Sequence, residues 1–119
     1  MKAINISEKL SLFSDLWSPK KIAELNGQQI LLAKVKGVFV WHQHEDEDEL
    51  FFVIKGQLKI HLKTETIILN PGELFVVPKG VAHKPEAENE VHLMLFEPLK
   101  IKHTGDVVVD LTVDTFEKI

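Results

Sequence analysis

The sequence predicts an all-β domain built as a sandwich or a small barrel. From residue 20 onward, apolar and polar residues alternate with a two-residue period. Glycine, proline and asparagine interrupt this alternation at intervals of roughly ten residues, a spacing typical of short strands joined by tight turns. A chain of 119 residues without a linker or an internal repeat is expected to form one domain over residues 1–119.

The N-terminal segment is compatible with one short helix. Residues 7–15 would form it, with Ser7 as the N-cap. Leu10, Phe13 and Trp17 would then lie on one face of the helix, available for packing against the sheet.

The first two strands are predicted over residues 20–25 and 28–35. Asn26-Gly27 lies between them and indicates a type I′ hairpin, because both central residues of that turn must tolerate a positive φ. Residues 38–44 are predicted as the next strand, with apolar or histidine side chains on both faces. One face carries Val38, Val40, His42 and His44, and the other carries Phe39, Trp41 and Gln43.

Further strands are expected over residues 50–54, 57–63, 66–69, 74–77 and 91–96. The turns between them are expected at Gly56, Asn70-Pro71-Gly72, Pro78-Lys79-Gly80 and Pro85 to Asn89. Within residues 57–63, apolar side chains alternate with lysines and His61, so that strand has one buried and one solvated face.

The C-terminal tail contains weaker signals. Thr104-Gly105-Asp106 is a turn signal, and residues 107–109 and 112–116 are apolar enough to form a strand or a covering arm. The expected organisation is therefore a core barrel over about residues 20–98 and a C-terminal arm over residues 99–119.

The composition excludes several classes of site. All 14 basic residues are lysines, and cysteine and tyrosine are absent, so a cysteine nucleophile, a thiolate zinc site and a guanidinium clamp are excluded. The net charge of −4 comes without a basic patch, which argues against nucleic-acid or membrane partners. The longest apolar run, residues 50–54, is too short to span a bilayer. A cytoplasmic protein is expected.

The histidines suggest a metal centre. His42 and His44 are two residues apart on a predicted strand, so their imidazoles would project from one face about 6.5–7 Å apart. Glu49 begins the following strand, and His83 follows a turn. Three imidazoles and one carboxylate form a ligand set for divalent Zn, Mn, Fe, Co, Ni or Cu.

These residues resemble the two motifs of the cupin superfamily. The first motif is matched by His42-Gln43-His44, four intervening residues, Glu49, six more residues and Gly56. The second is matched by Gly72, five residues, Pro78-Lys79-Gly80, two residues and His83. Fifteen residues separate the motifs, as in small single-domain microbial cupins of the mannose-6-phosphate-isomerase-like type.

The resemblance implies a jelly-roll barrel, or double-stranded β-helix, with one divalent metal bound by His42, His44, Glu49 and His83. Two positions depart from the family pattern. Gly37 precedes His42 by four intervening residues instead of five, and Ala87 replaces the asparagine that often closes the second motif. Neither position supplies a metal ligand.

The remaining acidic, histidine and aromatic residues have structural interpretations. Glu45 to Asp48 are expected to form a solvated loop, whereas Glu49 shares its parity with Phe51 and Val53, which are expected to line the interior. His61 is expected at the surface, His92 in the core or an interface, and His103 has no assigned role. Phe39, Trp41 and Phe52 are expected in a core layer or a subunit interface, and the outward parity of Phe39 and Trp41 predicts a homodimer.

The implied centre has a charge of about +1, from a divalent ion and one carboxylate, and would attract an anionic or chelating ligand. Such cupins act as dioxygenases, lyases or isomerases, or bind ligands without catalysis. Because arginine is absent, a small unphosphorylated, oxygen-chelating molecule is favoured over a phosphosugar. A non-catalytic metal or ligand-binding module and a phosphosugar-isomerase-like enzyme stay as alternatives, and no catalytic residue is assigned.

Overall fold

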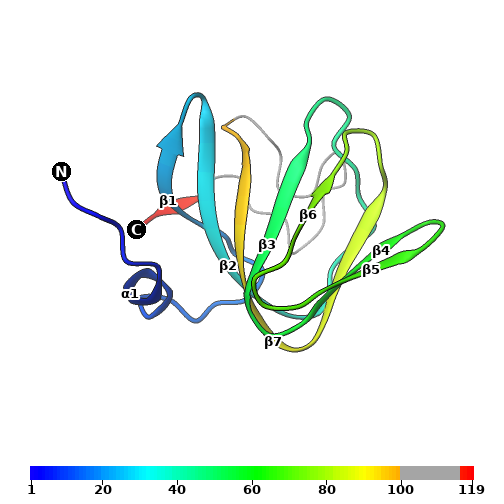
Figure 1. Ribbon diagram of the computed structural model, residues 1–119, viewed down its shortest axis with the longest axis horizontal. Helices are drawn as coiled ribbons and strands as arrows, with labels where there is room; N and C mark the ends of the chain where they lie inside the picture. The colour runs from blue at the N-terminus through cyan, green and yellow to red at the C-terminus, as the bar shows by residue number, and fades with distance from the viewer. Residues whose placement is uncertain (100–115) are drawn as a thin grey trace.

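The computed structural model describes residues 1–99 and 116–119. Strands dominate and wrap around one interior (Figure 1), which confirms the all-β prediction. In chain order the elements are α1 (Ile6–Leu10), β1 (Lys20–Leu25), β2 (Gln28–Val38), β3 (Glu49–Lys55), β4 (Leu58–Leu62), β5 (Thr66–Leu69), β6 (Leu74–Val77), β7 (His83–Pro98) and β8 (Glu117–Lys118).

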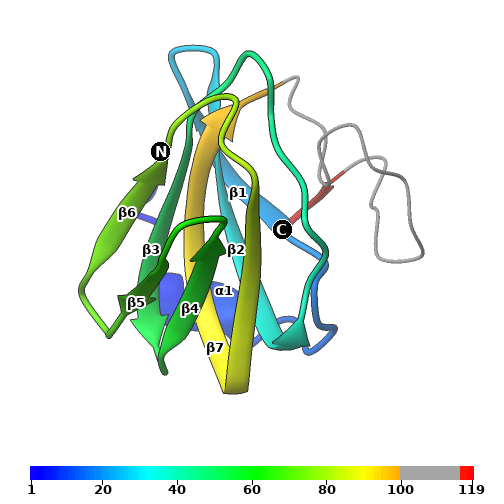
Figure 2. The ribbon, with the colours of Figure 1, turned by 90° about the vertical axis from the view of Figure 1, so that its right-hand side faces the viewer.

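The long strands β2 and β7 hold the fold together. They pair antiparallel with each other, and a register shift between Val35 and Gly37 bends the pair. The C-terminal half of β7 also pairs with β3, and its N-terminal half pairs with β4. The sheet therefore folds over itself and encloses an interior (Figure 2), although the described strands do not form a closed ring of pairing.

The first hairpin agrees with its sequence signal. Asn26 and Gly27 have φ values of 50° and 74°, as a type I′ turn requires. β1 and β2 pair on either side of this turn, with Leu25 opposite Gln28.

The predicted helix begins earlier and ends earlier in the structure. Asn5, not Ser7, is the N-cap, because its Oδ1 accepts a hydrogen bond of 2.9 Å from the backbone N–H of Glu8. The helix ends at Leu10, which packs against the sheet as expected. Phe13 packs in the same cluster, but Trp17 packs against the interior core instead.

Two strand predictions were wrong. β2 continues to Val38, and residues 39–48 lie outside the strands except for an isolated bridge between His42 and His83. The proline and asparagine between residues 85 and 89 do not interrupt β7. The buried side chains of Pro85 and Ala87 alternate with half-buried neighbours, so the two-residue period continues to Ala87 before three exposed residues, 88–90, interrupt the burial pattern within the same strand.

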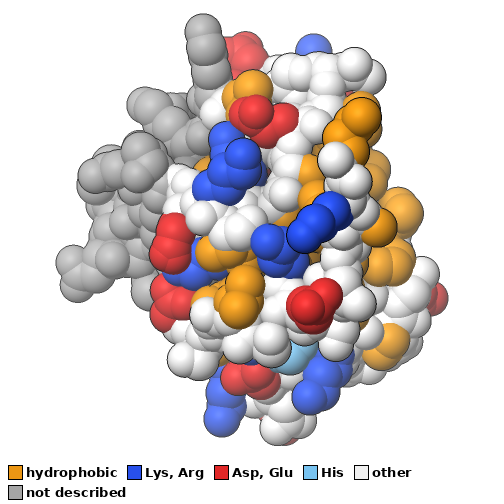
Figure 3. Space-filling view, turned by 90° about the vertical axis from the view of Figure 1, so that its left-hand side faces the viewer, with side chains coloured by type: hydrophobic (Ala, Val, Ile, Leu, Met, Phe, Trp, Pro, Cys, Tyr) orange, Lys and Arg blue, Asp and Glu red, His pale blue; other side chains and the backbone are white. Residues whose placement is uncertain are grey.

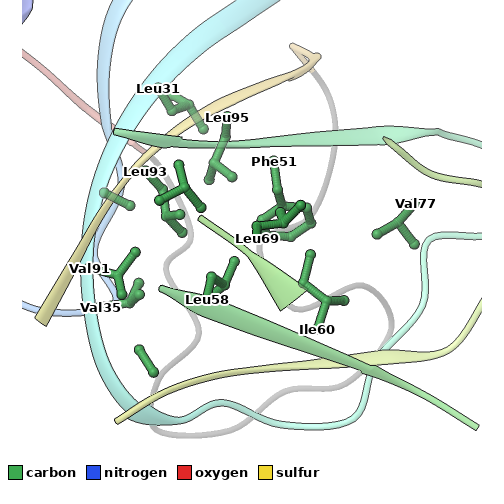
Figure 4. Close-up of a cluster of buried hydrophobic side chains, with 13 residues drawn as sticks. Leu31, Val35, Phe51, Leu58, Ile60, Leu69, Val77, Val91, Leu93 and Leu95 are labelled. Atoms are coloured by element: carbon green, nitrogen blue, oxygen red, sulfur yellow. The ribbon is translucent and has the colours of Figure 1, made fainter. Parts of the chain in front are cut away.

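The core fills the space between the two faces of the folded sheet. Its buried hydrophobic residues come from β2 to β7 and point toward one another (Figure 4). They are Leu31, Ala33, Val35, Phe51, Val53, Leu58, Ile60, Leu69, Val77, Ala87, Val91, Leu93 and Leu95. The predicted interior positions Phe51 and Val53 are therefore confirmed.

The outer face of the sheet is covered only in part. α1 packs on it, with Leu10 against Ile22 and Leu32. Away from α1, Leu74 and Val76 of β6 are 56% and 42% exposed. Figure 3 shows hydrophobic side chains gathered along one edge of the molecule, the side on which β6 lies.

The described end of the chain returns to the first strand, because β8 pairs in parallel with β1. The predicted turn at residues 104–106, the run at 107–109 and most of residues 112–116 lie outside the described residues. Within the described part of the chain, no helix is long and apolar enough to cross a membrane.

Candidate metal centre

His42 and His83 are placed by a short backbone bridge. The backbone N–H of each residue donates to the carbonyl of the other, at 3.0 and 2.9 Å. The Nδ1 atoms of the two rings lie 2.9 Å from the carbonyl oxygens of Val40 and Val81 respectively. These carbonyls can only accept, so Nδ1 carries a proton in both rings, and in the neutral form of each ring Nε2 has a free lone pair.

His44 and Glu49 complete a four-residue cluster. Glu49 Oε1 lies 3.6 Å from His44 Nε2 and 3.5 Å from His83 Nε2. One potential ligand atom from each of the four residues lies within 4.8 Å of the others, and all four residues are buried. The fold therefore brings together His42, His44, Glu49 and His83, as the sequence predicted.

The loop between His44 and Glu49 is tied to the turn that precedes His83. The backbone N–H of Gly80 donates to the His44 carbonyl at 2.8 Å, and that of Lys79 donates to Asp48 Oδ1 at 2.8 Å. The other acidic residues of this loop are exposed or half-buried, which confirms the predicted solvated loop. The loop thus holds His42 and His44 next to His83.

The cluster fits a divalent cation. His44 Nε2, Glu49 Oε1 and His83 Nε2 are buried and have no hydrogen-bond partner. Such unpaired buried polar atoms cost free energy, and each of these three is a good ligand for a transition metal. A bound cation would satisfy all three at once.

The electrostatics favour the same protonation states that a metal requires. Burial, and then the neighbouring His83, lower the pKa of His42 from 6.5 to about 4, so this imidazole is neutral at pH 7. Burial alone raises the pKa of Glu49, but its neighbours, first among them the carboxyl group of Glu97 acting as a hydrogen-bond donor, outweigh burial and hold that pKa well below its usual range. Glu49 is therefore ionised.

Glu97 is a buried carboxyl group that the sequence interpretation missed. It is 2% exposed, and its Oε2 has no hydrogen-bond partner. Leu50 of β3 pairs with Phe96 of β7. One position further along these antiparallel strands, Glu49 therefore lies opposite Glu97. Burial and the charge of Glu49 raise the pKa of Glu97 well above its usual value. Its parity with Leu93 and Leu95 was the signal that could have identified it.

Beside the metal cluster lies a small, partly open cavity with a volume of about 40 Å³. His42 and Glu49 are the only polar side chains among the described residues that line it. Phe51 packs edge-on against His83, with ring centroids 6.1 Å apart. The cluster therefore borders an apolar chamber.

Phe39 does not point outward as predicted. It is 6% exposed, stacks on Trp17 and meets His42 edge-on, with the Phe39 and His42 ring centroids 5.4 Å apart. Because residues 39–48 leave the regular strand, the alternation of side chains no longer sets their direction. Trp41 is half-buried and lies under the ammonium group of Lys63, 3.7 Å from its ring centroid.

The remaining described histidines lie outside the cluster. His61 is partly exposed and contacts Glu86, with 2.6 Å between His61 Nε2 and Glu86 Oε1. His92 is half-buried on the outer face, where its Nε2 lies 2.8 Å from Glu90 Oε2. His103 is outside the described residues.

The comparisons with known proteins agree with this geometry. The family model described as "Cupin domain" matches residues 30–97, which is more than half of the chain. A Bacillus subtilis (strain 168) protein named "Uncharacterized protein YdbB" is 37% identical over 83 residues, covering 69% of this chain and 67% of that protein.

Two solved structures are also similar. The structure of a cupin-2 domain containing protein from Shewanella frigidimarina NCIMB 400 has a TM-score of 0.79 and 50% identity, covering 80% of this chain and 93% of that one. The structure of protein NMB1881 from Neisseria meningitidis has a TM-score of 0.75 and 32% identity, covering 82% and 99%. The expected jelly-roll cupin fold is thereby confirmed.

Proposed function

The chain belongs to the cupin family, and from this membership and its buried ligand cluster we propose that it is a metal-dependent enzyme. The proposed site holds one divalent transition metal through His42, His44, Glu49 and His83. The proposed reaction is of the dioxygenase, lyase or isomerase type, on a small oxygen-chelating molecule.

The observation that carries this proposal is the convergence of His44 Nε2, Glu49 Oε1 and His83 Nε2, which are buried together without hydrogen-bond partners. A divalent ion at this place would leave a centre with a charge of about +1 if Glu49 is the one charged ligand. When bound, it would supply Lewis-acid polarisation of a substrate oxygen or joint binding of substrate and dioxygen.

The chain's own residues would orient the ligands and keep water away. The carbonyls of Val40 and Val81 fix the rings of His42 and His83 with Nε2 toward the centre. The apolar walls of the cavity, Phe39 and Phe51 among them, limit the access of water to the ligands. A substrate oxygen bound here would therefore lie in a low-dielectric environment, where its interaction with a cation is strengthened.

The substrate proposed is unphosphorylated. The chain has no arginine, and no lysine is found among the described residues that line the cavity. A phosphate group would bring negative charge into an apolar space that already contains the carboxylate of Glu49. A phosphosugar is for this reason a weaker candidate than a small keto acid, diketone or diol.

The test is elemental analysis of protein purified without added metal. About one equivalent of transition metal is expected in the parent, with a large loss in the double variant His42→Ala/His44→Ala. His61→Ala is the matched control, because that histidine lies outside the cluster. Less than about a tenth of an equivalent in the parent, unchanged in the double variant and after dialysis against Zn²⁺ or Mn²⁺, would exclude the metal site.

A non-catalytic metal or ligand-binding module is the second candidate. Among the described residues that line the chamber, His42 and Glu49 are the only polar side chains, and both are proposed metal ligands. No other side chain is then available there to transfer a proton, which supports a non-catalytic role. Oxygen uptake and product formation by the metal-loaded protein, with a panel of diketones, catechols, keto acids and sugars, separate the two candidates. Tight binding of one compound without turnover favours the module.

We also propose a homodimer, formed through the outer face of β3 and β6 and not through Phe39. The exposed Leu74 and Val76 pair with Phe52 and Leu50 in neighbouring strands and form a continuous apolar strip. Sedimentation is expected to show a dimer at micromolar concentration and a monomer for Leu74→Glu. A monomeric parent would contradict this proposal. The cytoplasmic location and the lack of nucleic-acid and membrane partners stay predictions.

A further inference from the structure

Trp17 lies in the arm between α1 and β1, outside the segment that the cupin family model matches. It nevertheless lines the cavity beside His42 and Glu49. This ring is therefore a part of the chamber wall that the family's barrel segment does not supply.

The arm is fastened to β2 at two points. The backbone N–H of Trp17 donates to the carbonyl of Lys34, and its indole Nε1 donates to the carbonyl of Lys36, each at 2.9 Å. These bonds fix the ring in position, so the tryptophan is a built feature of the chamber.

The backbone at Trp17 is held in an unusual conformation. Its φ is 58°, in the left-handed region that bulky residues rarely adopt. Glycine would relieve this strain, but it would remove the ring. The two hydrogen bonds to β2 hold the backbone in this conformation.

The tryptophan joins Phe39 in one aromatic wall. Their ring centroids are 4.7 Å apart with an interplanar angle of 14°, and Phe39 in turn meets the His42 ring edge-on. The wall thus runs from the arm to a proposed metal ligand. A molecule that chelates the metal would have its remaining atoms beside these rings.

We propose that Trp17 and Phe39 are specificity-determining residues, whose stacked rings select oxygen chelators with an apolar or aromatic body. This inference rests on the proposed metal site. The rings offer an apolar surface, and Leu93, Leu95 and Pro85 continue it around the cavity. A strongly polar body would lose its hydration without gaining a partner there.

Two hydroxamates with the same chelating head test the preference. Benzohydroxamate carries a phenyl group where acetohydroxamate carries a methyl group. If the phenyl group buries about 80 Å² more apolar surface, benzohydroxamate should bind about 30-fold more tightly, at roughly 25 cal/mol per Å². Binding is measured on cobalt(II)-loaded protein from its visible spectrum, which reports ligands at the metal, and by calorimetry.

Variants then test which side chains cause the preference for benzohydroxamate. In Trp17→Ala the ratio of the two dissociation constants should fall to about fivefold or less, while acetohydroxamate and cobalt(II) bind as in the parent. Trp17→Phe should retain most of the ratio because it keeps a ring. Phe39→Leu gives a second variant with smaller loss of volume. Trp41→Ala is the matched control, because that tryptophan packs under Lys63 and does not line the cavity.

The outcomes are distinguishable. A parent that binds cobalt(II) but shows a ratio near one, or a ratio that Trp17→Ala and Phe39→Leu leave unchanged, would overturn the selectivity role and leave the metal site standing. A parent that binds no cobalt(II) at the four ligands would overturn both proposals.

Discussion

His42 should make the metal-free protein sensitive to mild acid. Burial, and then the neighbouring His83, lower its pKa from 6.5 to about 4, whereas the unfolded chain takes up a proton near the ordinary value. A histidine whose folded pKa is depressed loses stability as the pH falls from the unfolded value toward the folded one. The full effect corresponds to about 3 kcal/mol, of which about 2 kcal/mol is lost between pH 7.5 and pH 5.

The perturbation is His42→Asn, which keeps an N–H donor near the Val40 carbonyl and removes the titrating ring. Urea unfolding of EDTA-treated protein, followed by tryptophan fluorescence, gives the free energy of unfolding at both pH values. The parent should lose about 2 kcal/mol more than the variant on going to pH 5. His61→Asn is the control and should track the parent.

A difference between parent and His42→Asn that stays constant from pH 7.5 to pH 5 would refute the reasoning. It would mean that the imidazole is already protonated in the folded protein or is not buried. Saturating Zn²⁺ adds a separate check. It should stabilise the parent at pH 7.5 by mass action and much less at pH 5, where protons compete for the same nitrogens.

Three further predictions concern other parts of the chain. Gly56→Ala should destabilise the protein by at least about 2 kcal/mol, because φ is +86° and the new Cβ would lie 2.9 Å from the Glu90 carbonyl oxygen. Gly80→Ala, which has a positive φ but no atom within 4 Å of the new Cβ, should cost about 1 kcal/mol in the same urea titration; equal costs would contradict the steric argument. The pKa of Glu97 is raised in the folded protein, so the parent loses stability as the pH rises above 4.5, where the carboxyl group ionises in the unfolded chain. Glu97→Gln lacks this group, and the metal-free variant should therefore become increasingly stable relative to the parent. Unfolding free energies at pH 5 and pH 8 test this, and a gap that does not grow would count against a buried protonated Glu97. Asn5→Ala should cost about 1 kcal/mol and Asn5→Asp nearly nothing, since only the alanine removes the acceptor for Glu8 N–H; thermal unfolding that ranks the two alike would refute the cap.

Much of the fold could be predicted from the sequence because alternation and turns are local signals. The Asn26-Gly27 hairpin and the strands at residues 66–69 and 74–77 have the predicted bounds. The prediction failed where local signals misled. Pro85 looks like a break, yet it lies within β7 opposite Ile60, with its side chain buried. The bounds of the domain and of its arm stay predictions.

The candidate site could also be predicted from local signals, namely the residue types and their spacing. His42, His44, Glu49 and His83 occupy the ligand positions of the two motifs that resemble the cupin superfamily, and all four come together in the structure. Glu97 was missed because a single carboxylate after an apolar strand has no distinctive spacing. The direction of Phe39 was wrong because parity holds only inside a regular strand, and β2 ends at Val38.

The sequence by itself determined the all-β class and the ligand types, because alternation and the chemistry of imidazole and carboxylate are properties of short segments. Only the tertiary structure decided which side chains share the chamber. Trp17 reaches Phe39, and Glu97 lies beside Glu49, through contacts between segments far apart in the chain. Such contacts depend on the register and bend of β2 and β7, which no local pattern encodes.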